Sequence, residues 1–230
     1  MIQEKMNING IPAILWGPKS DRIYLYVHGK LSCKEYAEEF AKIAEEKGYQ
    51  TLSFDLPAHG ERKSENRRCD IWNGMQDLTL IGDYVFSNWS EVSLFACSLG
   101  AFFSLNTYGE RNFQKCLFQS PIVDMEYLIH QMMLWSHISE EQLFTEKEIE
   151  TPLDLLSWDY YQYVREHSRY HWDFPTYILY GAKDNLQSLP VMKRFADRYG
   201  CQLSVSENSE HPFMAKEDIP IVANWMREHI

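Results

Sequence analysis

The stretch Val92-Ser-Leu-Phe-Ala-Cys-Ser98-Leu-Gly100 decides the fold of this chain. Its first part is rich in β-branched and aromatic residues and predicts a buried strand, and the apolar residues 101–108 after it predict a helix. Ala96 and Gly100 stand two residues before and two residues after Ser98. A strand that turns sharply into a helix needs small residues at these places, because the two elements nearly touch there. The stretch therefore predicts strand, sharp turn and helix, with Ser98 at the apex in a strained backbone conformation.

Cys97 is the competing choice for the apex residue. With Cys97 at the apex, the small positions would be occupied by Phe95 and Leu99, and both side chains are too bulky. The register therefore favours Ser98. A chance small-x-Ser-x-small match inside an ordinary strand and helix is the alternative, and the rest of the chain has to decide between them.

The composition predicts one globular domain over residues 1–230. Hydrophobic residues make up 45% of the chain and charged residues 24%, which is enough for a substantial core. The net charge of −11 repels polyphosphate, so we expect no nucleic-acid partner. No stretch approaches the roughly 18 apolar residues of a membrane span, and residues 1–5 lack a signal-peptide core. We therefore expect no membrane span and a cytoplasmic location.

The five cysteines form an odd set without CxxC spacing. This pattern predicts reduced, structural thiols and argues against a disulfide framework or a zinc site. The sequence also has no glycine-rich phosphate loop and no cluster with metal-ligand spacing. We expect no metal and no cofactor, and the sequence leaves the oligomeric state open, with a homodimer as one option.

Strands alternate with helical segments along most of the chain, which is typical of a sheet with helices on both faces. We expect strands at residues 3–8, 11–16, 22–27, 51–55, 92–97, 116–120, 176–180 and 203–206. Asn9-Gly10 predicts a tight hairpin turn between the first two strands. Ser32 and Glu35 form a capping-box pattern that predicts the start of a helix. Between residues 121 and 172 the alternation stops, and this aromatic-rich segment is predicted to be helical or irregular.

Five segments together resemble the α/β-hydrolase superfamily, in particular its small cap-bearing esterases and lipases. They are His28-Gly29, Asp55-Leu-Pro-Ala-His-Gly60, Ala96-Cys-Ser98-Leu-Gly100, Gly181-Ala-Lys-Asp184 and Glu210-His211-Pro-Phe213. Ala96 and Ala58 stand where the family commonly has glycine, and neither change removes a catalytic group. The resemblance covers nearly the whole chain. It implies a doubly wound, mostly parallel sheet with a helical cap inserted at about residues 121–172.

The resemblance also implies a catalytic triad in the chain order Ser98, Asp184, His211. A serine hydroxyl becomes a good nucleophile when a histidine accepts its proton, and an acid has to orient that histidine. Asp184 follows a predicted strand with GxxD spacing and is the preferred acid. Asp124, just after the preceding strand, is the alternative.

The backbone N–H groups of Lys30 and Leu99 match the family's oxyanion-hole positions. His28 and His59 are interpreted as structural histidines beneath the site. Trp135 and Trp158, from the predicted cap, are our candidates for substrate-binding residues, because the cap has more large apolar side chains than a small hairpin should bury. The other interpretation is that these aromatics are only the core of the cap.

These expectations describe a serine hydrolase that cleaves a small-molecule carboxylic ester through an acyl-enzyme, with an apolar or aromatic acyl or alcohol group. The same triad also fits a thioesterase, a C–C hydrolase, an aminopeptidase or an acyltransferase, because fold and triad do not determine the leaving group. A non-catalytic interaction protein with this fold is a further alternative. The basic pairs Arg62-Lys63 and Arg67-Arg68 predict either a solvated loop or contacts to an anionic substrate group.

Overall fold

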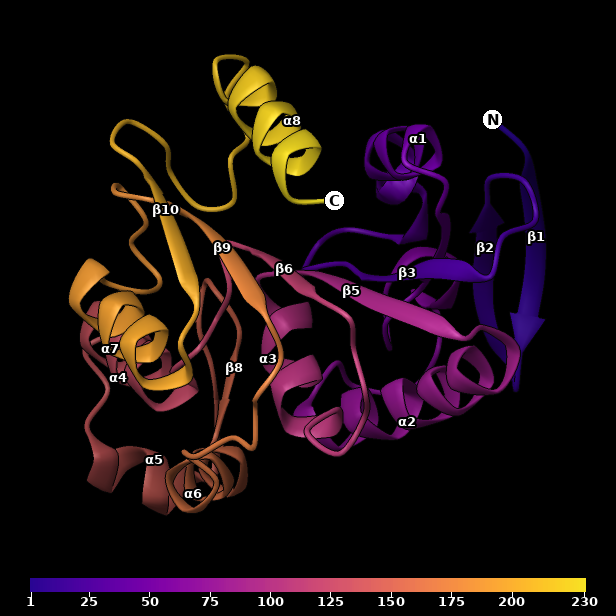
Figure 1. The fold of residues 1–230 in the computed structure, drawn as a ribbon. Helices are drawn as coiled ribbons and strands as arrows, with labels where there is room; N and C mark the ends of the chain where they lie inside the picture. Colours follow the sequence, from indigo (N-terminus) through magenta and orange to yellow (C-terminus); the bar gives the residue numbers. More distant parts are fainter.

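The computed structural model describes residues 1–230 and contains an eight-stranded mixed sheet (Figure 1). Its strands are β1 (Gln3–Ile8), β2 (Ile11–Trp16), β3 (Arg22–Val27), β4 (Gln50–Phe54), β5 (Glu91–Cys97), β6 (Cys116–Gln119), β9 (Thr176–Gly181) and β10 (Gln202–Ser206). They are arranged in the order β1-β2-β4-β3-β5-β6-β9-β10. β2 pairs antiparallel with β1 and with β4, and every other pair is parallel. The predicted mostly parallel sheet is confirmed.

Helices cover both faces of this sheet, and each face has its own apolar core. The α-helices are α1 (Glu38–Glu46), α2 (Ile71–Asn88), α3 (Leu99–Thr107), α4 (Met125–Trp135), α5 (Glu140–Glu146), α6 (Trp158–Glu166), α7 (Leu189–Tyr199) and α8 (Asp218–His229). Helices α1 and α8 lie on one face, and α2, α3 and α7 lie on the other (Figure 1). The core beneath α2 and α3 has 41 buried residues and the core beneath α1 and α8 has 17. None of the helices combines the length and the apolarity needed to cross a bilayer.

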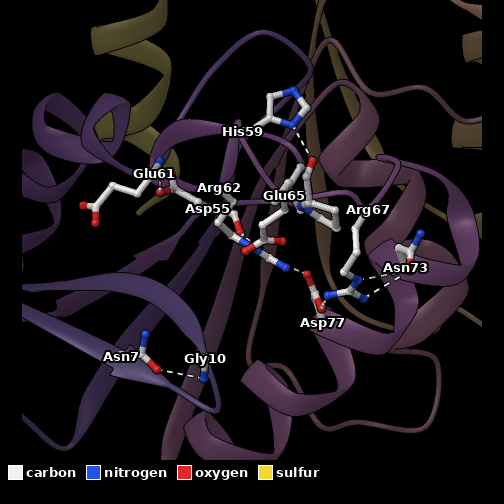
Figure 2. A network of polar contacts seen from close by, with 12 residues as sticks. Asn7, Gly10, Asp55, His59, Glu61, Arg62, Glu65, Arg67, Asn73 and Asp77 are labelled. Carbon is white, nitrogen blue, oxygen red and sulfur yellow. Dashed lines mark hydrogen bonds and ion pairs between the residues drawn. The ribbon is translucent and has the colours of Figure 1, made fainter.

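The predicted hairpin turn at Asn9-Gly10 forms, whereas the predicted capping box of Ser32 and Glu35 does not. Asn9 and Gly10 both have positive φ, and the Asn7 carboxamide oxygen accepts a hydrogen bond from Gly10 N–H at 2.7 Å (Figure 2). In place of the capping box, a short 3-10 helix begins at Lys34, and no side chain caps its start. The Glu35 carboxylate instead lies 3.0 Å from the Lys34 ammonium, which is the stronger partner for it.

The segment between β6 and β9 contains α4, α5 and α6, and also two short strands that were not predicted. β7 (Glu148–Glu150) pairs antiparallel with β8 (Leu155–Ser157). Strands of three residues are too short to show an alternating pattern in the sequence. The apolar side chains of this segment join the larger core, so the segment packs directly on the α2 and α3 face of the body.

Candidate active site

Ser98 lies at the apex of the turn between β5 and α3. Its backbone has φ 49° and ψ −117°, a conformation that a residue with a side chain rarely adopts. Ser98 N–H donates to Gln119 O at 3.1 Å, which holds the turn against the end of β6. A Cβ atom on Gly100 would stand 2.4 Å from His28 O. Glycine is therefore required at that position, as the register argument predicted.

Ser98, His211 and Asp184 form one chain of hydrogen bonds. Ser98 Oγ lies 2.8 Å from His211 Nε2, and His211 Nδ1 lies 2.7 Å from Asp184 Oδ2. Because the carboxylate only accepts, Nδ1 carries the proton and Nε2 accepts from the serine hydroxyl. Both the His211 and the Asp184 side chains are buried, at 8% and 0% exposure. A histidine in this tautomer is placed to remove the proton of Ser98.

The Asp184 carboxylate is held in place by backbone groups of its own loop. Its second oxygen, Oδ1, accepts from Leu186 N–H at 2.8 Å and from Gln187 N–H at 3.1 Å. The alternative acid, Asp124, has a different partner: its carboxylate accepts from Tyr127 N–H at 2.8 Å and caps α4. The structure therefore joins Asp184 to His211 and leaves Asp124 at a helix start.

The loop with His211 is fixed against the end of β9. Lys183 N–H donates to Ser209 O at 3.0 Å, and Ala182 N–H donates to Ser206 O at 2.8 Å. A Cβ atom on Gly181 would stand 2.4 Å from Ser209 O, so only glycine permits this approach. The glycine of the GxxD segment thus brings the histidine loop within reach of the aspartate.

Two backbone N–H groups near Ser98 are suited to a developing negative charge. Leu99 is the first residue of α3, where a backbone N–H has no partner within the helix. Lys30 follows β3, and its N–H donates to no other group of the protein. The next residue is fixed, because Leu31 N–H donates to His59 Nε2 at 3.0 Å. His59 therefore holds the loop with Lys30, which agrees with the structural role predicted.

His28 fixes the neighbouring loop from beneath. Its Nε2 accepts from Leu56 N–H at 3.0 Å, and its Nδ1 donates to Gly29 O at 2.7 Å. Burial lowers the pKa of His28 to about 4, so the ring is neutral at physiological pH and keeps both bonds. The rival nucleophile Cys97 lies at the end of β5, and burial raises the pKa of its thiol to about 12.

Of the basic residues after β4, Arg62 and Arg67 belong to a polar network around the buried Asp77 (Figure 2), which neither interpretation of the sequence predicted, whereas Lys63 and Arg68 are exposed, as a solvated loop predicts. The Arg62 side chain is only 3% exposed; it forms an ion pair with Asp77 and donates to Asp55 O at 3.0 Å. Arg67 donates to the other oxygen of Asp77 at 3.0 Å. Arg68 pairs with Glu148 of β7. These guanidinium groups are occupied by carboxylates of the protein itself, which local sequence could not show.

A narrow cavity of about 100 Å³ opens beside Ser98. Its walls are mostly aliphatic and come largely from α4 and from the segment 153–157. They include Leu99, Ile122, Met125, Leu128, Ile129, Met132, Leu153, Leu155, Leu156 and Leu186. Lys30, Cys69, Asp154, Ser157 and Tyr160 supply the polar part of the wall.

Trp135 and Trp158, predicted to bind substrate, do not line this cavity. Trp135 is 46% exposed at the end of α4, and Trp158 packs edge-on against Phe144 and Tyr161. The many aromatic residues of the segment 121–172 indicate that its side chains pack against one another. The number of aromatic residues does not predict which face of each helix turns toward Ser98.

A larger cavity of about 470 Å³ lies elsewhere, between α4, α7 and the end of α6. It shares only Met125 with the cavity beside Ser98. Its rim carries Arg194 and Arg198 together with Asp124, Glu126 and Asp197, so the charges are mixed. The position of Ser98, and not the size of the cavity, identifies the candidate site.

No protein-family model matches the sequence, and no curated protein matches it significantly. Solved structures do match. Est1E from Butyrivibrio proteoclasticus, with ferulic acid bound, superposes with a TM-score of 0.78 at 16% identity, over 98% of this chain and 96% of that one. The mouse alpha/beta hydrolase domain-containing protein 10 gives 0.79 at 15% identity, over 99% and 98%. The esterase Pf2001 from Pyrococcus furiosus gives 0.69 at 15% identity, over 99% and 89%. With its sheet order and the turn at Ser98, this chain therefore has the α/β-hydrolase fold.

Proposed function

We propose that the protein is a serine hydrolase that cleaves carboxylic esters through an acyl-enzyme intermediate. The observation that carries this proposal is the chain of hydrogen bonds from Ser98 through His211 to Asp184, with distances of 2.8 Å and 2.7 Å. Ordinary packing does not require three polar side chains in this order at a strained turn. The arrangement is the one that activates a serine hydroxyl.

In the first half of the reaction, Ser98 Oγ attacks the ester carbonyl while His211 Nε2 takes the hydroxyl proton. Asp184 stabilises the imidazolium that forms. The backbone N–H groups of Lys30 and Leu99 donate to the carbonyl oxygen as it becomes negative. His211 then gives its proton to the leaving alcohol, and Ser98 holds the acyl group.

In the second half, water replaces the alcohol. His211 takes a proton from the water as the water oxygen attacks the acyl carbonyl and forms a tetrahedral intermediate. The bond between Ser98 Oγ and the acyl carbon then breaks, His211 returns the proton to Ser98 Oγ, and the acid leaves. Each step uses only side chains and backbone groups already in place beside the cavity.

We also propose that residues 121–172 act as a cap that shapes the substrate site. The cavity wall that α4 and residues 153–157 supply is aliphatic, and each methylene buried against it contributes about 0.8 kcal/mol. This favours a small, uncharged ester with an apolar group. The ferulic acid bound to Est1E makes an aromatic acyl group a second choice to test. A cytoplasmic location remains a prediction from the sequence.

The proposal is tested with a fluorophosphonate probe and a panel of p-nitrophenyl esters, thioesters and amides. Intact-mass analysis should show one adduct, and Ser98→Ala should lose both the adduct and the turnover of esters. Cys97→Ser is the matched control and should keep both. Labelling that persists in Ser98→Ala and moves to Cys97, or turnover of thioesters or amides without esters, would contradict the proposal.

A further inference from the structure

Tyr160 has a buried hydroxyl group that no group of the protein satisfies. The residue lies near the start of α6 and lines the same cavity as Ser98. Its ring is held in place by Trp72, with 5.9 Å between the ring centroids. Buried unpaired polar atoms also occur in Tyr24, Thr51, Glu65, Ser93, Ser120, Gln162 and Trp225. Of these side chains, only that of Tyr160 lines the candidate site.

A buried hydroxyl without a partner costs stability, because folding removes its hydrogen bonds to water. Such a group in a binding cavity is satisfied when a ligand brings a matching atom. A tyrosine hydroxyl both donates and accepts, so a hydroxyl or a carbonyl oxygen of a ligand fits it. The unpaired state of the Tyr160 hydroxyl is thus a reason to expect a polar atom on the substrate in addition to the ester that reacts.

The other polar groups of the cavity already have partners or carry no charge. The Lys30 ammonium pairs with Asp154, and Ser98 is bonded to His211. Burial raises the pKa of the Cys69 thiol to about 12, so it is neutral. No unpaired cation lines the cavity to bind an anion, and the Asp154 carboxylate is already paired with Lys30 and is not available to a cation. The matching atom on the substrate is therefore expected to be uncharged.

We propose that the Tyr160 hydroxyl binds an uncharged hydroxyl or carbonyl oxygen in the apolar part of the substrate, and so selects oxygenated esters over plain hydrocarbon ones. This inference rests on the proposed esterase function. Tyr160 acts on specificity and does not take part in the chemical step.

The test compares two matched pairs of esters in wild type and Tyr160→Phe. The pairs are methyl hexanoate with methyl omega-hydroxyhexanoate, and methyl hydrocinnamate with methyl para-hydroxyhydrocinnamate. In at least one pair the wild type should favour the hydroxylated ester in kcat/KM by about tenfold, and Tyr160→Phe should remove that preference. Tyr163→Phe is the control on the same helix, since its hydroxyl contacts Met75 Sδ and lies outside the cavity wall. Equal ratios in wild type and Tyr160→Phe for both pairs would overturn the inference.

A binding measurement separates this inference from the proposed function. Ser98→Ala should bind esters without hydrolysing them. In the ester pair for which the wild type shows the preference, the hydroxylated ester should raise the melting temperature of Ser98→Ala more than its plain partner does. The double variant with Tyr160→Phe should lose the difference. A positive result here with no hydrolysis by the wild type would refute the esterase proposal and keep the binding role, whereas equal shifts would refute the role of Tyr160.

Stability without any ligand gives a third readout. Because the hydroxyl has no partner in the folded protein, Tyr160→Phe should leave the melting temperature unchanged or raise it. A lower melting temperature in Tyr160→Phe, with Tyr163→Phe unaffected, would show that the protein itself satisfies the hydroxyl and would overturn the inference.

Discussion

The Lys30 ammonium pairs with the Asp154 carboxylate and donates to Leu153 O at 3.1 Å, so one side chain joins the loop after β3 to the turn between β7 and β8. The backbone N–H of the same residue is our candidate oxyanion donor. The contact therefore connects the wall of the cavity to the group that would bind the reacting oxygen.

Asp154→Asn should weaken this connection without touching Ser98, His211 or Asp184. Half-exposed ion pairs contribute about 0.2–1 kcal/mol, so we expect KM for p-nitrophenyl hexanoate to rise by up to about fivefold with kcat nearly unchanged. High salt should raise the wild-type KM in the same direction, because it screens the pair. Glu38→Gln, which removes an exposed ion pair with Lys42 on α1, should change neither value. A fall in kcat with constant KM would contradict the expectation.

Asp184→Asn should lower kcat by up to about 10⁴ while substrate binding stays largely intact, because the asparagine favours the wrong histidine tautomer. Asp124→Asn is the matched control, since asparagine also caps a helix and should keep the bond to Tyr127 N–H. Both variants should unfold at the wild-type temperature within a few degrees. The reverse ranking of the two kcat values would transfer the role of acid to Asp124.

Met132→Ala should shift the preferred acyl chain to greater length, because it removes part of the cavity wall. Trp135→Ala, on the same helix but exposed, should leave the profile of kcat/KM against acyl length unchanged. The measurement is a series of p-nitrophenyl esters of increasing chain length. If the tryptophan variant changes the profile and the methionine variant does not, the assignment of the wall is wrong.

Asp77→Asn should destabilise the protein by up to about 3–5 kcal/mol, because it removes the buried carboxylate that Arg62 and Arg67 share and leaves Glu65 as the remaining charged partner of the buried Arg62 guanidinium. Urea unfolding measures this loss. Asp83→Asn removes the partner of Arg111 at the surface and should cost about 1 kcal/mol or less. Similar losses in the two variants would show that the buried network contributes no more than a surface pair.

Acid should destabilise the protein through His28. Its pKa is about 4 in the folded state, against a usual value of 6.5, so the unfolded state binds more protons between these pH values. This contribution is complete above pH 6.5 and is lost as the pH falls to about 4, by roughly 3 kcal/mol.

Urea unfolding above pH 6.5 and near pH 4 measures this loss. His28→Gln keeps an acceptor for Leu56 N–H and should lose less stability between the two conditions. The exposed His171 is the control: pairing with Glu110 raises its pKa, so it stabilises the protein in acid, and His171→Gln should keep the wild-type loss or increase it slightly. The same loss in His28→Gln as in wild type would exclude His28 as the source.

The strands and the turn at Ser98 could be predicted because their signals are local. Small residues flank Ser98 because the strand and the helix nearly touch at this turn, and the residues before Ser98 are apolar because the strand is buried. The pairing of Arg62 with Asp77 could not be predicted in this way, because Asp77 reaches it from the next helix. Nor could the orientation of Trp135, because only tertiary packing decides which face of α4 turns toward the cavity.

The segment 121–172 is attached to the body in unequal ways at its start and at the turn near Asp154. At its start, Ile122 N–H donates to Ser98 O at 3.2 Å, so this end is bonded to the backbone of the proposed nucleophile. Near Asp154, the attachment is made by the Lys30 ammonium, which pairs with the Asp154 carboxylate and donates to Leu153 O. For enzyme engineering, this means that insertions at residues 120–124 displace the reacting atom itself. Length changes at residues 151–154 remodel the cavity wall and its contact with Lys30 and leave the bond to Ser98 in place, so this turn is where a library for altered substrate range belongs.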